Sequence, residues 1–494
     1  MRKLSPLPYL LVALLLLSFT TMMTAQSTKS PLPNSPVSTG VLMARAVRAG
    51  KVHLTGSSLN RVNPNLTCSP APCTLPNVDA SSSPVLANET PVVVNPANSQ
   101  QILTGANDYN CTNIQGFYAS NDGGSTWTRT CLNALAGDFG EGDPGVAYDA
   151  AGTAYISGID ATHGIVFEAS RTNGATWSSP QLAVPPFFSG GLTDKPWMQI
   201  DTSQTSPFKN TIYMSVTQFD ASETNIVPTV SHSSDGGKTW SAPIALDTTQ
   251  VFPAVDQFTD IATGADGTVY VTWMRCTATG PSGDCGRTLA TFYLAKSTDG
   301  GNTFSSPTVI ATAGLAPDPG FCCFYGQLPN TDERISNIPV IAVDNSSGPN
   351  AGNLYVAYYT WKGYMRLLVA TSKDGGNSWS VTSPTPASDT HDQFFPWINV
   401  SRNGFVGVSW MDRRNDPANV NYEAFAAFSS NGGASFSTNL DMSAAPSDPF
   451  NDGFGGAFIG DYTGNAWAGS TLYVTYTDTT TGIDQDFLTG VATQ

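Results

Sequence analysis

Short apolar runs separated by turn residues dominate the chain after residue 86. The runs are too short for helices and are rich in Val, Ile, Tyr and Trp, which favours β-strands. In each unit a buried-looking first strand leads through a Gly or Asn turn into a second strand of the same kind. We count seven such units, whose first strands start at Pro91, Pro144, Pro196, Thr259, Pro339, Pro396 and Tyr462.

A turn motif, Ser-x-Asp-x-Gly-x-Thr/Ser-Trp/Phe, recurs between later strands of these units. Four full copies occupy residues 120–127, 233–240, 297–304 and 372–379, and weaker copies at 170–177 and 429–436 have Thr172 and Asn431 in place of the Asp. The Gly can adopt φ > 0, as a tight turn requires, and the carboxylate can accept turn N–H groups. We therefore predict a structural role for Asp122, Asp235, Asp299 and Asp374.

A repeat of this period indicates an array of supersecondary units. The roughly 400 residues after position 86 are too many for one ordinary core but suit a radial array of sheets. We predict an all-β propeller of four-stranded antiparallel blades, with seven blades preferred. The seventh unit lacks room for a fourth strand, which an N-terminal strand such as Val52 to Thr55 could supply.

The N-terminal region differs in composition from the repeats. Residues 1–25 combine Arg2 and Lys3 with a short apolar run and small residues near Ala25, which is typical of a secretory signal peptide. The alternative, a membrane anchor, would need a longer apolar run. Residues 26–86, rich in Ser, Pro, Thr and Asn, are interpreted as a linker and N-terminal arm, and residues 87–494 as the propeller. We expect a secreted or periplasmic monomer without a membrane span after signal removal.

Charge and cysteine content narrow the class of protein. A net charge of −16 argues against nucleic acids and anionic membranes as partners, and an anionic ligand would need a local Arg cluster. The eight cysteines are an even set, for which export favours disulfides. Nearest-neighbour pairing would give Cys68–Cys73, Cys111–Cys131 and Cys276–Cys285; the adjacent Cys322 and Cys323 are poorly placed to bond to each other.

The turn motif resembles the Asp box of the sialidase (neuraminidase) superfamily, also known as the BNR repeat. In that family the box joins the third and fourth strands of each propeller blade, away from the catalytic face. Sialidases have six blades, so six is the alternative to seven. The resemblance covers residues 86–494 at the level of fold and repeat.

One face of such a propeller gathers the loops that enter first strands and leave second strands. Acidic residues crowd at those positions, and Arg275, Arg334, Arg413 and Arg414 map to the same face. Sialidases hold the carboxylate of sialic acid with three converging arginines. The stretch from Arg402 to Arg414 looks like the family strand that ends in one of them, and Arg334-Ile335 is a loose likeness of the Arg-Ile-Pro motif.

The resemblance implies a retaining exo-sialidase that acts on terminal acidic sugars of glycans. Tyr462, in Gly460-Asp461-Tyr462-Thr463-Gly464, would be the nucleophile, with Glu333 or Glu141 as its partner and Asp194 or Asp143 as the acid. The four arginines, His391 and Asp392 would bind the substrate. The family's Arg-Ile-Pro strand comes before its boxes, however, whereas Arg334 falls in the fifth unit.

Two alternatives remain open. The arginines could instead form ion pairs that brace the blades, and the chain could be a non-catalytic propeller that binds glycan or protein on the same face. We expect no cofactor and no metal site, since the four histidines have no metal-ligand spacing. Asp478, Asp484 and Asp486 are possible ligands of a structural Ca²⁺, although a solvated loop is the simpler interpretation.

Overall fold

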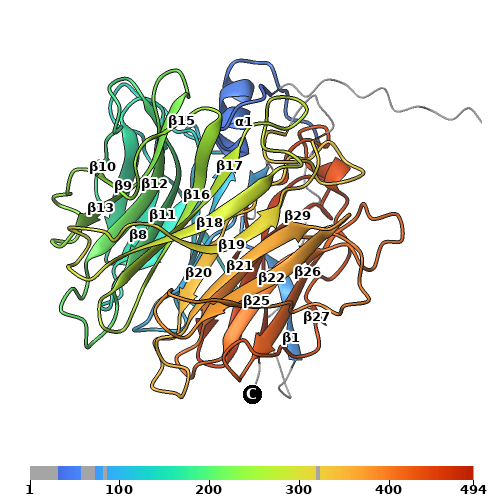
Figure 1. Ribbon diagram of the computed structural model, residues 1–494. Helices are drawn as coiled ribbons and strands as arrows, with labels where there is room; N and C mark the ends of the chain where they lie inside the picture. Colours follow the sequence, from blue (N-terminus) through green and yellow to red (C-terminus); the bar gives the residue numbers. More distant parts are fainter. Residues whose placement is uncertain (1–31, 57–72, 82–85, 319–322, 493–494) are drawn as a thin grey trace, which may run out of the picture.

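The computed structural model describes residues 32–56, 73–81, 86–318 and 323–492. Within them, seven antiparallel sheets stand around a central axis (Figure 1), which confirms the seven-bladed prediction. The signal peptide prediction, residues 1–25, lies outside the described residues. No described helix is long and apolar enough to cross a membrane.

The blades follow one another in sequence order. Blade 1 consists of β2 (Ala87–Asn88), β3 (Val92–Val94), β4 (Ile102–Asp108), β5 (Gly116–Ser120) and β6 (Thr128–Cys131). Blade 2 consists of β7 (Gly145–Tyr148), β8 (Ala154–Asp160), β9 (Gly164–Ser170) and β10 (Gln181–Val184). Blade 3 consists of β11 (Leu192–Ile200), β12 (Ile212–Phe219), β13 (Asn225–Ser233), β14 (Ile244–Ala245) and β15 (Gln250–Val251).

Blade 4 consists of β16 (Ala254–Thr263), β17 (Val269–Thr277), β18 (Leu289–Ser297) and β19 (Thr308–Gly314). Blade 5 consists of β20 (Val340–Val343), β21 (Leu354–Trp361), β22 (Met365–Ser372) and β23 (Ser380–Thr382). Blade 6 consists of β24 (Gln393–Val400), β25 (Val406–Asp412), β26 (Glu423–Ser429) and β27 (Leu440–Asp441). A 3-10 turn, η1 (Pro449–Asn451), precedes blade 7.

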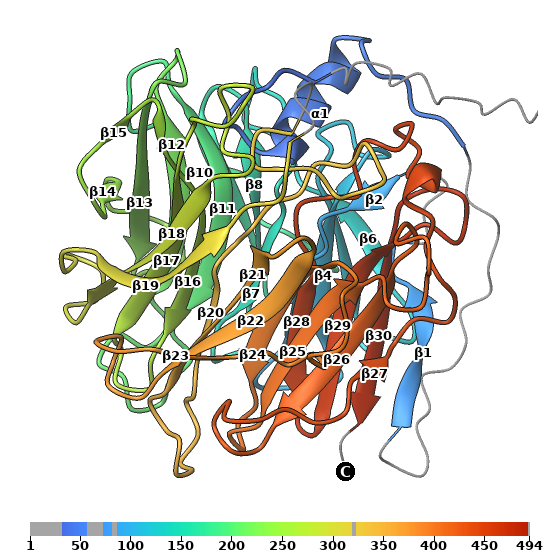
Figure 2. The ribbon, with the colours of Figure 1, turned by 45° about the vertical axis from the view of Figure 1, so that its right-hand side comes forward.

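Blade 7 combines three strands from the C-terminal part of the chain with one strand from the N-terminal part. Its strands are β28 (Gly464–Ala468), β29 (Thr471–Asp478), β30 (Gln485–Ala492) and the N-terminal β1 (Cys73–Asp79), which pairs with β30 (Figure 2). The prediction that an N-terminal strand completes the seventh blade is confirmed, but the suggested segment, Val52 to Thr55, is wrong: it forms no strand, and Thr55 N donates to Gly453 O at 2.9 Å. β1 buries Leu75 and Val78 and accommodates Pro76 at a register shift of an outer strand, where a missing N–H is tolerated.

The repeated turns join the third strand to the fourth at one end of the propeller. In the copy at Asp235, Oδ1 accepts from the Thr239 N–H at 3.0 Å and Oδ2 from the Thr239 hydroxyl at 2.6 Å. Gly236 and Gly237 have φ of 76° and 85°. In the weaker copies Thr172 Oγ1 and Asn431 Oδ1 accept the equivalent N–H, so both departures keep the bond.

Helix α1 (Thr39–Arg48) lies across the opposite end of the axis (Figure 1). The sequence predicts a linker here, whereas Ser38 caps a ten-residue helix that buries Val41, Met43 and Ala44. We call this end of the channel the α1 end and the other, where the repeated turns lie, the box end.

Two of the predicted disulfides lie entirely within the described residues, and both are confirmed. Cys111–Cys131 and Cys276–Cys285 are bonded. Cys73 and Cys323 are also disulfide-bonded, while Cys68 and Cys322 lie outside the described residues, so Cys68–Cys73 stays a prediction.

Candidate functional site

Buried ionisable side chains meet on the axis directly beneath α1. We define the axial cluster as Glu89, Asp143, Asp194, Lys195, Asp461 and Tyr462, all at most 2% exposed. They come from blades 1, 2, 3 and 7, at the point where the chain enters each innermost strand. The cluster thus contains three residues predicted for catalysis: Tyr462, Asp194 and Asp143.

Backbone strain positions three of these side chains. Glu89, Asp143 and Lys195 have φ of 61°, 55° and 48°, the left-handed region that costs a non-glycine residue about 1 kcal/mol or more. Lys195 sits in a β-bulge of β11, which redirects a side chain. The equivalent positions of blades 4 and 6 are held by Phe258 and Phe395, also with positive φ. The same positive-φ conformation is therefore used for a charged residue in blades 1 to 3 and for a Phe in blades 4 and 6.

Burial perturbs the protonation of the cluster. It raises the pKa of Asp143 to about 7, with Asp194 adding repulsion, and raises the pKa of Glu89 well above its usual range. The two carboxyls face each other, since a Cβ on Gly40 would lie 2.8 Å from an oxygen of each, and the charge of Asp143 raises the pKa of Glu89 further. The pair thus places two carboxyls of raised pKa side by side.

Lys195 and Tyr462 complete the cluster. The Lys195 ammonium lies 3.9 Å from the centre of the Tyr462 ring and 4.3 Å from that of Trp197. Burial lowers the pKa of Lys195, and the charge of Asp143 opposes that shift most strongly. The Tyr462 hydroxyl donates to Pro144 O at 3.3 Å. Burial, and next the charges of Glu89 and Asp143, raise the pKa of Tyr462 well above its usual range.

The start of α1 is pressed against the carboxylates of the cluster. The Ser38 N–H donates to Asp194 Oδ2 at 2.6 Å and the Thr39 N–H to Asp461 Oδ2 at 2.9 Å. A Cβ on Gly40 would lie 2.8 Å from both Asp143 Oδ1 and Glu89 Oε1, so only glycine fits. The positive end of the helix dipole thereby offsets part of the buried negative charge.

Further contacts fix the segment that precedes and contains α1. Pro36 O accepts from Gln257 Nε2 at 3.1 Å and from the Tyr325 hydroxyl at 2.5 Å. Arg45 forms a two-pronged ion pair with Glu141, with both N–O distances 2.8 Å. Residues 32–48 consequently close the α1 end of the channel.

Glu333 and Glu141, the two predicted partners of Tyr462, lie elsewhere. Glu333 is fully buried, and burial followed by repulsion from Asp452 raises its pKa well above the usual range. Glu141 pairs with Arg45 of α1. The carboxyl whose charge raises the pKa of Tyr462 most is that of Glu89, which the sequence analysis missed. Its context, Glu89-Thr90-Pro91, matches Asp143-Pro144 and Lys195-Pro196 in its position before a first strand, and this was the available signal.

The predicted substrate-binding arginines divide into two groups. Arg334 belongs near the axial cluster: the charge of Asp461 opposes the lowering of its pKa to about 10 by burial, and its Nη1 has no hydrogen-bond partner among the described residues. The others form separate ion pairs. These are Arg275 with Asp256 and Asp247 at 2.6 and 2.7 Å, Arg413 with Asp392 at 3.7 Å, and Arg414 with Asp389 and Asp412.

His391 also pairs with Asp389, at 3.1 Å. The contacts of Arg275, Arg413, Arg414, His391 and Asp392 are those of braces within and between blade loops, which is the alternative that the sequence left open. Their roles in substrate binding remain predictions.

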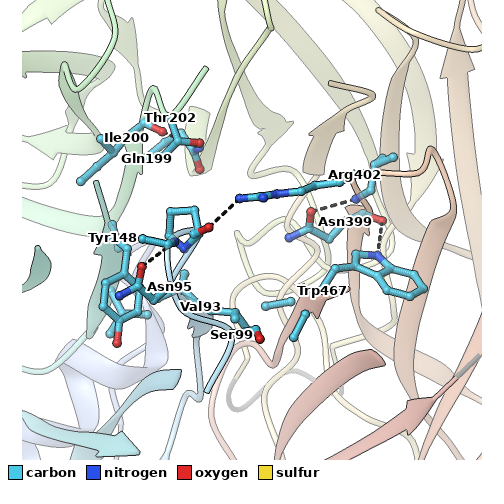
Figure 3. Close-up of a pocket in the computed structure, with 18 of the residues that line it drawn as sticks. Val93, Asn95, Ser99, Tyr148, Gln199, Ile200, Thr202, Asn399, Arg402 and Trp467 are labelled. Atoms are coloured by element: carbon cyan, nitrogen blue, oxygen red, sulfur yellow. Dashed lines mark hydrogen bonds between the residues drawn. The ribbon is translucent and has the colours of Figure 1, made fainter. Parts of the chain in front are cut away.

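The box end of the channel is open. A cavity of about 560 Å³ lies there, lined in part by Asn95, Tyr148, Gln199, Asn399, Arg402 and Trp467 (Figure 3). Arg402 reaches across to Pro96 O at 2.8 Å, and Trp467 Nε1 donates to Asn399 O at 3.3 Å. A smaller space of about 250 Å³ shares several of these residues and extends to Trp197 and Trp397.

Three aromatic rings separate the two ends. Trp197 lies 4.6 Å from Trp397 and 5.6 Å from Tyr462, centre to centre, and Trp397 lies 6.2 Å from Tyr462. The axial cluster is therefore bounded by this aromatic layer on one side and by α1 on the other.

No family model matches the sequence, and no curated protein matches it. Solved structures with a similar fold include the Hadza microbial sialidase Hz136 (14% identity, covering 80% of this chain and 74% of that one, TM-score 0.45). An ulvan lyase of polysaccharide lyase family PL25 aligns at 10% identity over 83% and 95% of the two chains, TM-score 0.49. The α-L-arabinofuranosidase Arb93A of Fusarium graminearum aligns at 12% identity over 71% and 92%, TM-score 0.43.

Proposed function

We propose that this chain is a glycoside hydrolase whose acid–base centre is the axial cluster, and that residues 32–48 hold this centre closed in the present conformation. The observation that carries the proposal is the carboxyl pair of Glu89 and Asp143, which lie together under Gly40 and whose pKa values are both raised by burial. Cleavage of a glycosidic bond needs a protonated carboxyl for the leaving oxygen and a second group that attacks or activates water. Buried carboxyls with raised pKa values, such as Glu89, Asp143 and Asp194, can hold or accept a proton near neutral pH.

The specific mechanism that we propose is retaining hydrolysis of the sialidase type. Tyr462 attacks the anomeric carbon, and its phenolic proton passes to the carboxylate of the Glu89–Asp143 pair. Asp194 donates a proton to the leaving oxygen and later accepts one from the attacking water. Arg334, the arginine with an unpaired nitrogen near this centre, would bind a substrate carboxylate. Here the Glu89–Asp143 pair takes the part expected of Glu333 or Glu141.

A substrate can approach the cluster only if residues 32–48 leave it, because Ser38 and Thr39 occupy the carboxylates of Asp194 and Asp461. Two changes would open the site. A protease recognition sequence inserted between Gly50 and Lys51, both exposed, would allow α1 to be released. Alternatively, Gly40→Val would place a side chain where the Glu89 and Asp143 oxygens lie.

The test is hydrolysis of fluorogenic glycosides, sialoside and neutral sugars included, by the intact protein and by the cut protein after release of the fragment is confirmed by mass spectrometry. We expect turnover to appear or rise on cutting, and to be lost in Tyr462→Phe. A cut protein that keeps its circular dichroism spectrum but hydrolyses none of the glycosides would refute the proposal. A preference for the sialoside, reduced by Arg334→Gln, would support the sialidase-type version.

A non-catalytic glycan- or protein-binding propeller is the second candidate. It is favoured by the separate ion pairs of Arg275, Arg413 and Arg414 and by the closed α1 end. The open cavity at the box end would then be the binding surface. This alternative predicts glycan binding by the intact chain that is unchanged in Tyr462→Phe but weakened in Trp467→Ala.

A further inference from the structure

Three potential metal ligands meet at the rim of the α1 end, outside the axial cluster. Asp138 precedes β7, Asp160 is the last residue of β8, and His163 lies in the turn before β9. One ligand atom from each lies within 4.8 Å of the other two. Among residues 32–56, 73–81, 86–318 and 323–492 this is the one such group of His, Cys, Asp and Glu. We propose that Asp138, Asp160 and His163 bind a divalent cation of the zinc class.

Two buried carboxylate oxygens at this site have no donor among the described residues. Asp160 is 1% exposed; its Oδ2 accepts from the Leu135 N–H at 2.7 Å, but its Oδ1 accepts nothing. The side chain of Asp138 is also 1% exposed, and its Oδ1 is equally without a donor. Burying anionic oxygens without hydrogen bonds is costly, and a cation held between them removes that cost.

Asp138 is held rigidly by its other oxygen. Oδ2 accepts from the Thr162 N–H at 2.9 Å and from the His163 N–H at 3.0 Å, and it lies 2.7 Å from His163 Nδ1. These bonds keep the carboxylate and the imidazole in one place before any ion arrives. Preorganisation of this kind is what supporting hydrogen bonds give to metal ligands.

The ligand set selects the class of ion. Two carboxylates and one imidazole suit Zn²⁺, Co²⁺ or Mn²⁺, whereas Ca²⁺ takes six to eight oxygen ligands. The His163 side chain is 43% exposed, so water can complete the coordination. The earlier calcium candidates do not form such a group: Asp484 accepts from Asn88 and Asp486 from Thr104.

The site would reinforce the closure of the α1 end. Asp138 and Glu141 belong to the same loop, and Glu141 is the partner of Arg45. In that loop Phe139 also lies 3.5 Å beneath the Arg48 guanidinium. A cation that ties Asp138 to Asp160 and His163 would fix this loop against the β8–β9 turn, and would thus stabilise the contacts that hold α1.

The proposal is tested by titrating the untagged, chelator-treated full chain with ZnCl₂, CoCl₂ and CaCl₂ in a calorimeter, with the visible spectrum of the Co²⁺ form as a second readout. We expect one equivalent of Zn²⁺ or Co²⁺ to bind and Ca²⁺ to bind far more weakly. Asp160→Asn and His163→Ala should each weaken Zn²⁺ binding at least about tenfold and change the Co²⁺ spectrum.

His391→Ala is the matched control, because His391 pairs with Asp389 at 3.1 Å but has no third ligand of this kind within the described part of the chain. It should leave Zn²⁺ binding unchanged. His163 is partly exposed, so His163→Ala keeps the fold and isolates the loss of one ligand. Absence of Zn²⁺ and Co²⁺ binding by the unmodified chain, or binding that is unchanged in both Asp160→Asn and His163→Ala, would overturn the proposal.

Discussion

The two ends of the channel place the same residue type in opposite environments. At the box end Asp235 is exposed and Asp299 is partly exposed, and hydrogen bonds from the turn, led by the Thr239 and Thr303 hydroxyls, lower their pKa to about 2. At the α1 end Asp143 is fully buried, as is Asp260 at the level of Trp197, and loss of solvation raises the pKa of each to about 7.

The difference distinguishes carboxylates that stabilise a turn from carboxyls that are suited to acid–base chemistry. A carboxylate whose donors lie within four residues of it is a component of a turn. A carboxyl that several blades bury together, beside other carboxyls and an ammonium, can change its protonation state near neutral pH, which acid–base chemistry requires. Matched substitutions, one among the buried groups and one in an exposed turn or loop, test this distinction.

The largest difference should appear in catalysis by the opened protein. Asp143→Asn removes a carboxylate from the axial pair and is expected to lower the rate of glycoside hydrolysis at least about 100-fold. Asp374→Asn, a matched change in an exposed turn, should leave the rate unchanged. Initial rates on the best fluorogenic glycoside decide the matter, and equal losses in both variants would contradict the assignment.

The next largest effect concerns the arginines. Arg275→Ala leaves Asp256, which is 0% exposed, without its ion-pair partner and should destabilise the fold by about 3 kcal/mol. Arg402→Ala, at the box-end cavity, removes a guanidinium that bonds only a carbonyl near the surface, so its cost should be below about 1 kcal/mol. Urea unfolding measures both. A neutral Arg275→Ala would argue against the brace interpretation.

A smaller effect is expected at a single turn. Asp235→Ala removes the acceptor of the Lys238 and Thr239 N–H groups and should cost about 1 kcal/mol, since water replaces it at the surface. Lys238→Ala keeps the acceptor and should be nearly neutral. Thermal unfolding of the two variants compares them directly, and Asp235→Asn should retain part of the stability, as the natural Asn431 copy indicates.

The pH dependence of stability should differ in sign between the buried axial carboxyls and the carboxylates of the repeated turns. Asp260 has a folded pKa of about 7, above the usual value near 4, so unfolding releases a proton between about pH 4 and 7, and its contribution falls as pH rises. Asp299, with a pKa of about 2, contributes stability that is lost as pH falls from about 4 to 2. Asp260→Asn should flatten the decline above pH 4 in urea unfolding curves.

The sequence predicted those features whose causes are local. The turn at Asp235, its glycines and its aromatic residue lie within eight positions, so the hairpin and the repeat were visible. The closing strand was not, because Pro76 interrupts β1 and Lys51 to Thr55 looked more regular. Helix α1 was hidden in a Ser- and Pro-rich region, although Ser38 is a typical helix cap.

The candidate site depended on contacts between distant segments. Asp143 and Asp194 were identified because acids before first strands share one face, and Tyr462 was identified from the resemblance of Gly460 to Gly464 to the sialidase sequence around the catalytic Tyr. Glu89 followed the same rule but escaped notice, and Glu333 obeyed it without reaching Tyr462. Spacing of histidines gave no metal signal, since Asp138 and Asp160 approach His163 only through the loop before β7 and the end of β8.

Covalent trapping of the nucleophile would show whether the axial cluster is the reaction centre. The opened protein would be incubated with a fluorinated mechanism-based analogue of a glycoside that it hydrolyses, and the labelled peptide identified by mass spectrometry. The account predicts one label, on Tyr462, that is absent from Tyr462→Phe and from the intact protein. A label on a residue of the box-end cavity, or full hydrolysis by Tyr462→Phe, would contradict it.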